Sequence, residues 1–328
     1  MLKFIIKRLL ISTAILFAVM FIIYTIMRSL PADYVETVAR ELATKPGSLP
    51  REEWIRRLNA MYGLDQNIVM GFFNWLGKAA QGQFGDSWHY TVPVVDKFKE
   101  VVWFSFYLGA AAFILQMSIS IPLGVLAAKK QYSATDYTVT VVALIGISLP
   151  TFFVATLLKL IFSIKLQWFD ISGRVGRDYD TLSAFGQFLD QAKQFILPIV
   201  TLVIIGIGGM MRYTRTNMLE VLNSDYIRTA RAKGLSERKV INYHAFRNTL
   251  IPIVTIIGGS LPGLFSGALI TETLFALGGI GFTSYTAMMT GDIPFTMFYL
   301  TFMAILTLLG TLIADILYAV VDPRVRVN

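Results

Sequence analysis

The sequence is short of the residue types that catalytic and metal-binding sites most often use. Of its 328 residues none is cysteine and only two are histidine, His89 and His244. The lack of cysteine excludes a disulfide scaffold, a thiolate metal site, an iron–sulfur cluster and a cysteine nucleophile. Charge is also scarce, at 15% of residues, against about 25% in an average soluble domain. Together with 55% hydrophobic residues, this composition excludes an intrinsically disordered chain.

Sequence motifs for nucleotide hydrolysis and for hydrolytic catalysis are missing as well. The chain contains no GxxxxGK[ST] loop, no Gly-x-Ser-x-Gly elbow and no HExxH motif. The sequence Gly206-Ile207-Gly208 follows no predicted strand, as a dinucleotide-binding fingerprint would require. We therefore expect a chain that is not an enzyme and that holds no metal or cofactor of its own.

Long apolar segments dominate the chain instead. A transmembrane helix needs about 20 mostly apolar residues to cross a hydrocarbon core of about 30 Å. Six segments qualify: 9–27, 101–128, 137–164, 195–211, 249–275 and 297–320. The weakest is 195–211, which is short and rich in glycine. The first exceeds the 7–15 apolar residues of a signal peptide and precedes no small-x-small cleavage site, so we expect it to remain as a span. The sequence predicts an all-α integral membrane protein with six transmembrane helices.

Lysine and arginine are unevenly distributed between these spans. With a cytoplasmic N-terminus, 15 basic and 5 acidic residues lie in the cytoplasmic segments 1–8, 129–136, 212–248 and 321–328. The opposite side has 13 basic and 14 acidic residues, in segments 28–100, 165–194 and 276–296. Because basic residues concentrate in cytoplasmic loops, both termini are expected in the cytoplasm. The formal net charge of +8 then reflects orientation in a membrane, and no nucleic-acid partner is expected.

The outer loop, 29–100, is predicted to be helical in two places. Helical spacing relates three apolar residues after Pro50 and before Gly63, namely Trp54, Leu58 and Met61. A second apolar face before Gly82 consists of Ile68, Phe72, Trp75, Leu76 and Ala79. We expect two amphipathic helices that lie on the outer membrane surface or cap the helical bundle. A loosely ordered interfacial loop is the alternative.

The cytoplasmic loop, 212–248, carries eight of the 15 inner basic residues. Leu219, Leu222, Tyr226 and Ala230 are spaced to form one apolar face of a helix that ends near Lys233. Gly234 is then expected to stop that helix in a left-handed conformation, before a second short helix. Such a loop either lies on anionic lipid or docks as a helix into a groove of a soluble partner. Spacing alone does not separate these two hypotheses.

A resemblance to a known family favours docking. The run Asp225-Tyr226-Ile227-Arg228-Thr229-Ala230-Arg231-Ala232-Lys233-Gly234-Leu235 resembles the coupling loop of ATP-binding-cassette importer permeases of the oligopeptide, dipeptide and nickel type. Arg228 and Thr229 depart from the Glu-Ala-Ala-x-x-x-Gly pattern of other importers, as they do in the peptide branch. Further motifs resemble the B-type subunit of peptide permeases: Gly63-Leu64-Asp65-Gln66, Asn74-Trp75-Leu76, Gly82-x-Phe84-Gly85, Ser148-Leu149-Pro150-x-Phe152, Glu272-Thr273-x-Phe275 and Asp322-Pro323-Arg324-Val325-Arg326.

The resemblance implies a type I importer permease fold. Its parts would be the N-terminal tail with the first span (1–28), the outer loop (29–100), the permease core (101–320) and a cytoplasmic tail (321–328). It also implies a multi-pass subunit of a bacterial or archaeal cytoplasmic membrane, with a second homologous permease, two cytoplasmic ATPases that bind ATP and Mg, and an extracytoplasmic peptide-binding protein as partners. Residues 225–235 would transmit the closure of the ATPases to the membrane helices. Ile227, within this range, is assigned no role.

Polar and small residues within the spans are candidates for the translocation path. They are Gln116, Ser148, Pro150, Thr151, Gly259, Pro262, Gly263, Ser266 and Gly267. For the glycines at four-residue spacing, we expect close helix packing, with a smooth wall of the path as the alternative. Glu272 lies 20 residues beyond Pro252, about 30 Å along a helix. We expect it to be a solvated carboxylate near the outer interface, with an outer-gate contact as the alternative.

These features predict the transmembrane subunit of an ATP-driven peptide importer. Nickel-chelate, glutathione and oligosaccharide importers of the same family are alternatives for the cargo. A stand-alone secondary transporter or channel is the alternative from a different class. No series of carboxylates crosses the predicted spans, which counts against a carrier driven by protons or sodium.

Overall fold

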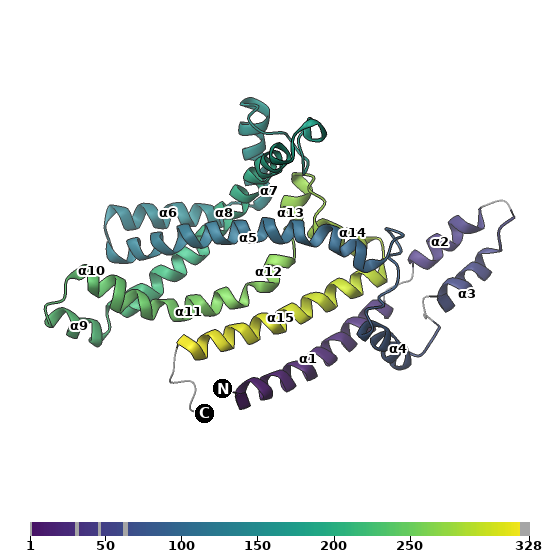
Figure 1. Cartoon of the computed structure of the whole chain (residues 1–328), viewed down its shortest axis with the longest axis horizontal. Helices are drawn as coiled ribbons and strands as arrows, with labels where there is room; N and C mark the ends of the chain where they lie inside the picture. Colours follow the sequence, from purple (N-terminus) through teal and green to yellow (C-terminus); the bar gives the residue numbers. More distant parts are fainter. Residues whose placement is uncertain (1, 30–32, 45–46, 62–64, 322–328) are drawn as a thin grey trace. The chain divides into compact units, whose positions relative to one another are not determined.

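The computed structural model of the chain describes residues 2–29, 33–44, 47–61 and 65–321. The part described is helical and contains one isolated bridge, Asp86 to Pro93, and no sheet. The α-helices are α1 Leu2–Ser29, α2 Asp33–Ala43, α3 Arg51–Met61, α4 Ile68–Ala80, α5 Val94–Lys129, α6 Ala134–Ser148, α7 Thr151–Leu158, α8 Ala184–Leu222, α9 Asp225–Ala232, α10 Glu237–Lys239, α11 Phe246–Gly259, α12 Leu261–Phe265, α13 Leu269–Leu274, α14 Ile280–Met289 and α15 Ile293–Val321 (Figure 1). The described residues also contain two π-helices, η1 Lys159–Lys165 and η3 Val240–Ala245, and one 3-10 helix, η2 Tyr179–Thr181.

The chain forms two compact units. The first contains residues 1–102 and 283–309, and the second contains residues 103–282 and 310–328. Five helical stretches of the described residues are long and apolar enough to cross a membrane: Ile6–Ser29, Val94–Lys129, Ala184–Leu222, Pro252–Leu274 and Ile293–Tyr318. A sixth candidate is the bent pair of α6 with the α7–η1 segment. The expectation of an all-α chain with several membrane spans is therefore confirmed, with five or six candidates.

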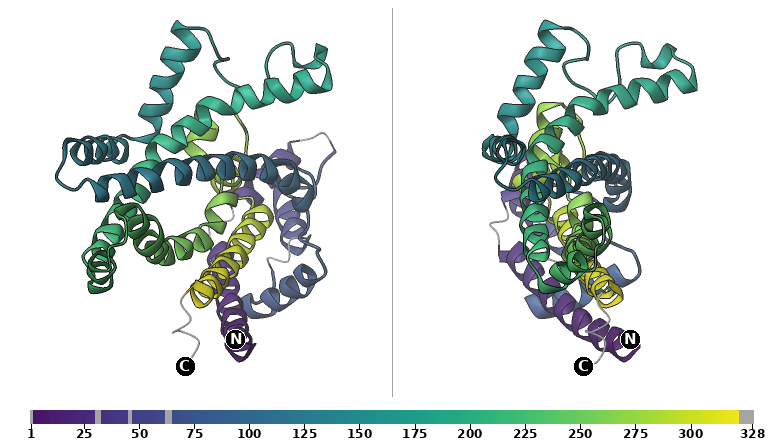
Figure 2. Two further views of the ribbon diagram at one scale, coloured as in Figure 1. Left: turned by 60° about the vertical axis from the view of Figure 1, so that its left-hand side comes forward. Right: turned by 90° about the vertical axis from the view of Figure 1, so that its left-hand side faces the viewer.

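The segment 137–164, expected as one helix, is bent by 100° between α6 and α7 (Figure 2). The break falls at Leu149, which is extended at ψ 129°, immediately before Pro150. Proline clashes with the preceding residue in a helical conformation and pushes it to extended backbone. An average over a hydropathy window does not register such a break, so the prediction of a single continuous helix was wrong.

The segment 249–275 is likewise not one helix but the succession α11, α12 and α13. The chain leaves helical geometry around Gly267, whose φ is +76°, a conformation that suits glycine because it has no Cβ. In contrast, 195–211 is only the middle of α8, a helix of 39 residues. The polar residues before residue 195 and after residue 211 continue the helix, which ends only at Leu222.

The first unit contains the two helices expected in the outer loop, α3 and α4, and one that was not expected, α2. Leu58 of α3 packs against Val35 and Ala39 of α2, and all three are buried. The side chain of Met61 and the whole of Gly63 lie outside the described residues. Gly82, which follows α4, has a positive φ of +77°. The apolar spacing of Val35, Val38 and Ala39 was the sequence pattern that would have revealed α2.

The first unit is also held together by a buried carboxylate at the start of α15. Asp292 is fully buried and accepts hydrogen bonds from the hydroxyl of Ser87 and the backbone N–H of His89. Its second oxygen accepts the N–H of Phe295 at 3.1 Å, as an N-terminal capping residue does. The loop before α5 is thereby attached to the beginning of α15.

Candidate functional site

The loop at residues 212–248, in the second unit, has two helices, α8 and α9, where the sequence predicts one continuous helix up to Lys233. α8 ends at Leu222, and α9 begins at Asp225 after the turn Asn223–Ser224. The hydroxyl of Ser224 donates to the carbonyl of Val221 at 2.6 Å. Serine and asparagine form such local hydrogen bonds in competition with the helix, and here they end it.

The inner face of α9 packs on the ends of the membrane helices. Ile227 and Ala230 are buried against Met218 of α8 and against Val240 and Ile241 of η3. Leu219 and Leu222 pack against this cluster as well. The loop is therefore built into the helical bundle through its own hydrophobic cluster.

Tyr226, predicted to lie on this apolar face, is instead 48% exposed, and Ile227 takes its place with no exposed surface. The turn at residues 223–224 changes the helical register between α8 and α9. At the start of α9 the buried position therefore falls on Ile227, whereas Ala230 is buried as predicted. The assignment of Tyr226 to the buried face was wrong for this reason.

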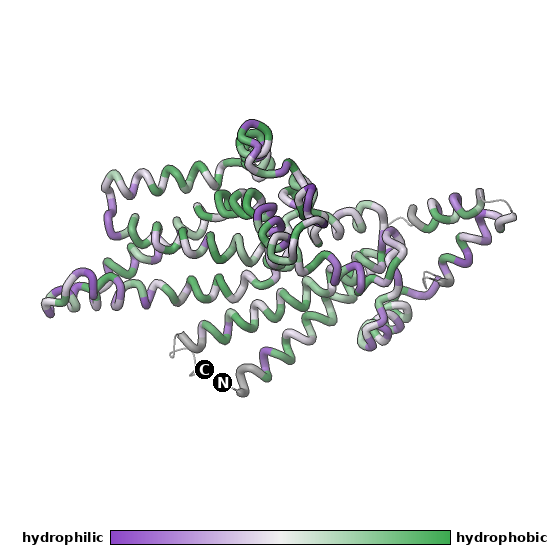
Figure 3. Tube along the Cα trace, turned by 45° about the horizontal axis from the view of Figure 1, so that its top comes forward, coloured by the Kyte–Doolittle hydropathy of each residue, from purple (hydrophilic) through white to green (hydrophobic). Residues whose placement is uncertain are grey.

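The outer face of α9 is exposed and basic. Its exposed residues are Asp225, Tyr226, Arg228, Thr229, Arg231 and Ala232, followed by Lys233 and Gly234. Figure 3 shows the hydrophilic colour concentrated at this tip of the second unit, around α9 and α10. One helix thus presents a charged surface outward while its other face is fixed to the bundle.

A glycine turn ends α9 as predicted. Gly234 has φ +77°, and its N–H donates to the carbonyl of Arg231 at 2.9 Å. The N–H of Leu235 reaches back to the carbonyl of Ala230 at 3.4 Å, and Leu235 packs on the buried cluster. This is the usual arrangement of a helix C-terminus closed by a left-handed glycine.

An ion pair spans the glycine turn. The guanidinium of Arg231 donates to Glu237 Oε1 at 2.8 Å and to Oε2 at 3.2 Å. These hydrogen bonds hold the pKa of Glu237 below its usual value. Because both side chains are about half exposed, the pair orients α9 relative to α10 and adds little to stability.

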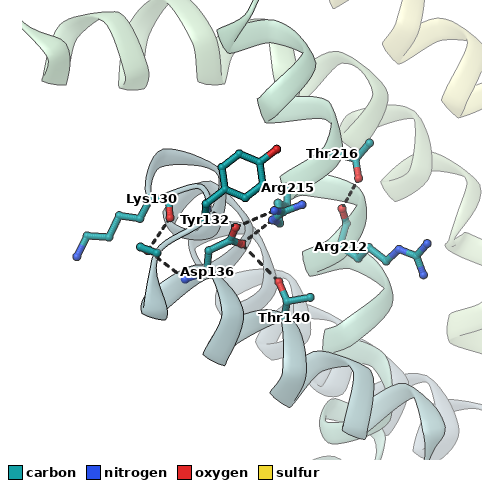
Figure 4. A network of polar contacts seen from close by, with 8 residues as sticks. Lys130, Tyr132, Asp136, Thr140, Arg212, Arg215 and Thr216 are labelled. Carbon is teal, nitrogen blue, oxygen red and sulfur yellow. Dashed lines mark hydrogen bonds and ion pairs between the residues drawn. The ribbon is translucent and has the colours of Figure 1, made fainter.

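An ion pair between a buried carboxylate and a partly exposed guanidinium supports α8 just before the loop (Figure 4). Arg215 Nε lies 2.7 Å from Asp136 Oδ1, and its Nη2 lies 2.8 Å from Oδ2, so the contact is bidentate. Asp136, 2% exposed, also accepts the N–H of Tyr132 and the hydroxyl of Thr140. This contact fixes the start of α6 to α8. Sequence analysis missed it, because the two residues lie 79 positions apart.

Glu272 is not a solvated carboxylate. It is completely buried, and its oxygens accept hydrogen bonds from the Ser105 hydroxyl at 2.7 Å, the Ala268 N–H at 3.1 Å and the Phe282 N–H at 2.8 Å. Three glycines make room for it, because a Cβ on Gly267, Gly279 or Gly281 would come within 3.0 Å of its carboxyl group. The expectation of a solvated side chain was therefore wrong, because the break at Gly267 in the segment 249–275 turns Glu272 into the second unit.

Comparison with known proteins identifies the scaffold that carries these features. The family model described as "Binding-protein-dependent transport system inner membrane component" matches residues 120–327, and the model of the corresponding N-terminal part matches residues 1–97. The chain belongs to this family of membrane permeases. The resemblance inferred from the loop motif is thereby confirmed.

Curated relatives cover the permease from end to end. The oligopeptide transport system permease protein AppB of Bacillus subtilis is 36% identical over 327 residues, covering 99% of this chain and all of the relative. The dipeptide transport system permease protein DppB of Escherichia coli K12 is 34% identical, and 99% of each chain is covered. OppB of Salmonella typhimurium, an oligopeptide transport system permease protein, is 36% identical over 99% of this chain and the whole of the relative.

The residues predicted to line the translocation path of the permease lie in different surroundings. Gln116 of α5 donates its side-chain amide to the carbonyl of Gly206 in α8 at 2.8 Å, so it joins two helices. Ser148 is exposed and bonds only to its own helix at Leu144. Pro150 is exposed beside it and Thr151 is half-buried, both at the bend before α7.

The small residues of α11 and α12 do not share one packing face. Gly259 and Gly263 are exposed, with open space where a Cβ would stand. The glycine that permits close helix packing is Gly258, where a Cβ would come 2.8 Å from Cα of Ala314 in α15. The expected packing face of Gly259 and Gly263 was therefore wrong by one position.

The remaining candidates lie at the break that follows. Pro262 is half-buried in the first turn of α12, where a missing N–H costs no helical hydrogen bond. Ser266 donates its hydroxyl to the Gly263 carbonyl at 3.0 Å, and Gly267 adopts the positive φ that separates α12 from α13. These residues shape the turn that brings Glu272 into its buried position.

Proposed function

We propose that this permease is the transmembrane subunit of an ATP-driven importer and forms half of the translocation pathway for peptides. The family and the three relatives, which are peptide transport permeases by name, support peptide cargo. The observation that carries the mechanism is α9, whose inner face is packed into the helical bundle while its basic outer face is unoccupied by the rest of the second unit.

The proposed topology has six spans and both termini in the cytoplasm. It counts the α6 to α7–η1 pair as one broken span. The excess of basic residues in segments 1–8, 129–136, 212–248 and 321–328 supports this orientation. The chain would then be a multi-pass subunit of a bacterial or archaeal cytoplasmic membrane.

The proposed partners follow from the chemistry that the chain lacks. It has no phosphate-binding loop, so ATP and Mg would be bound by two cytoplasmic ATPase subunits, and the chain itself would be non-catalytic. A second homologous permease would supply the other half of the path, and an extracytoplasmic binding protein would deliver the peptide. Membrane lipid surrounds the spans.

The proposed coupling step is a rigid-body movement of α9. An ATPase groove would hold residues 225–235 through the exposed side chains of Tyr226, Arg228 and Ala232. Because Ile227 and Ala230 connect α9 to α8 and η3, movement of the groove would be passed to α8 and α11. The bundle would then alternate between inward-open and outward-open states, with Gly259, Gly263 and the turn at Ser266 beside the path and Glu272 fixing the outer gate.

The test is purification from membranes followed by transport in liposomes. The chain should bring down ATPase subunits and a second permease, and peptide uptake should require ATP and the binding protein. Uptake of peptide by this chain alone without ATP would refute the proposal and favour a stand-alone carrier.

Variants of α9 test the coupling surface within that assay. Ala232→Arg enlarges an exposed residue and should abolish uptake and weaken ATPase binding while leaving membrane insertion intact. Gly234→Pro should do the same, since proline cannot adopt φ +77°. Ala230→Arg is not a clean test, because Ala230 is buried in the loop's own cluster. Lys130→Ala, exposed outside α9, is the control. Normal uptake by Ala232→Arg and Gly234→Pro would exclude α9 as the coupling element.

A further inference from the structure

The helix α4 of the outer loop packs beside the C-terminal half of the membrane-spanning helix α1 (Figure 1). The contact begins at the C-terminal end of α1, where Arg28 Nη2 donates to the carbonyl of Gln66 at 2.9 Å. From there the contact extends toward the middle of α1 through Phe72 and Phe73. The ring of Phe72 lies 5.7 Å from Tyr24, 5.1 Å from Phe21 and 5.3 Å from Phe17.

The register of these contacts sets the depth of α4. Phe73 lies 6.1 Å from Phe17, and Phe17 precedes the last residue of α1, Ser29, by 12 positions. At 1.5 Å per residue this is about 18 Å along the helix. Half of the hydrocarbon core is about 15 Å, so Phe73 reaches the middle of the thickness that α1 crosses. A helix resting on the membrane surface would contact only the last turn of α1.

The span α15 independently places α4 below the membrane surface. Phe72 belongs to a buried cluster with Met297 of α15, and Leu300 packs against that cluster. Leu300 lies seven residues into the span that begins at Ile293, or about 10 Å along it. Two different spans therefore place the central aromatic residues of α4 within the membrane thickness.

The two faces of α4 differ as this position requires. Val69, Met70 and Phe73 project away from the unit and are 51%, 65% and 55% exposed. Asn74 and Lys78 lie on the adjoining side of α4 and help to line a cavity of about 960 Å³, to which Phe73 and other residues of the first unit also contribute. The amide of Asn74 donates to Gln66 Oε1 at 2.8 Å, so part of the polar face is satisfied within the unit.

We propose that α4 is embedded in the membrane leaflet beside the C-terminal half of α1, with lipid acyl chains covering Val69, Met70 and Phe73. Lipid is favoured as the occupant because this apolar face is continuous with exposed apolar side chains of α1 through the Phe17–Phe73 contact. Apolar surfaces of this kind mark membrane or protein interfaces. The inference concerns the outer loop and does not depend on the cargo.

Single-cysteine labelling tests this position, since the chain has no cysteine of its own. Met70→Cys and Phe73→Cys are labelled with a nitroxide in the complete transporter in liposomes, and collisions with oxygen and with a water-soluble nickel chelate are measured. Ile22→Cys, 55% exposed on α1, is the lipid reference. Arg56→Cys on α3, whose side chain is 82% exposed, is the water reference. ATP-driven uptake verifies that each variant is assembled.

Positions 70 and 73 are expected to give the high oxygen and low nickel accessibility of position 22. Nickel accessibility equal to that of position 56 would overturn the proposal, because α4 would then face water. Low accessibility to both probes would also overturn it, because a protein partner would cover the face. A photo-crosslinking amino acid at position 70 provides a second measurement: lipid adducts support the proposal, and adducts to a second permease contradict it.

Discussion

Replacing Glu272 by alanine would remove the acceptor from three buried donors at once. The hydroxyl of Ser105 and the N–H groups of Ala268 and Phe282 all bond to its carboxyl oxygens. These donors come from α5, from the turn before α13 and from α14. Glutamine at position 272 would keep one carbonyl oxygen, so it would lose fewer of these bonds than alanine.

The expected loss of folding free energy follows from the contribution of single hydrogen bonds between helices in membrane proteins. Such bonds average about 0.6 kcal/mol and reach about 1.7 kcal/mol, because a chain unfolded in a membrane also finds partners. Three bonds therefore contribute about 2–5 kcal/mol, which is the predicted destabilisation by Glu272→Ala. Glu272→Gln, which places an amide donor against at least one N–H donor, is predicted to cost about 0.6–1.7 kcal/mol.

The assay is the thermal unfolding midpoint of the purified transporter in detergent. In a chain of 150–250 residues, 1 kcal/mol shifts the midpoint by about 2–4 °C, and a longer chain shifts less. The expected order of destabilisation is Glu272→Ala, then Glu272→Gln, then the control Thr273→Ala. Thr273 is exposed and bonds only within α13. A melting temperature of Glu272→Ala equal to that of the control would refute the reasoning.

Two further predictions concern helix contacts of α8 and use the same assay. Asp136→Ala leaves Arg215 without its acceptor and should destabilise by up to about 3–5 kcal/mol, the cost of breaking a buried pair; adding Arg215→Ala should recover part of the loss, and no recovery would contradict the assignment. Gly124→Ala should destabilise by about 1–3 kcal/mol through overpacking, because its Cβ would come 2.7 Å from the Met211 carbonyl. Gly209→Ala, with open space around it, should not destabilise.

Local patterns in the sequence predicted local structure well. The apolar spacing in the outer loop predicted α3 and α4, and Gly234 was correctly expected to end a helix at positive φ. These features depend on residues within one or two turns of each other. The motif at residues 225–235 also led to the correct family, because all of its residues are consecutive in the sequence.

Spacing patterns that continue across a break in a helix led to wrong predictions of side-chain burial. Counting at helical spacing through Asn223–Ser224 put Tyr226 on the buried face, whereas the turn moves Ile227 there. Assuming a straight helix predicted a solvated side chain for Glu272, whereas the break at Gly267 turns it into the protein interior. In both cases a periodicity argument holds only while the helix is continuous, and hydropathy does not report continuity.

The sequence by itself determined that this protein is helical, crosses a membrane several times and belongs to a family of transport permeases. Composition and local spacing suffice for this, because the bilayer imposes apolar helices of fixed length. Only the tertiary structure decided which polar residues are buried together. Asp136 with Arg215, and Glu272 with Ser105, meet across 79 and 167 positions of the chain. Such partners are chosen by how the helices pack, which no local pattern of residues records.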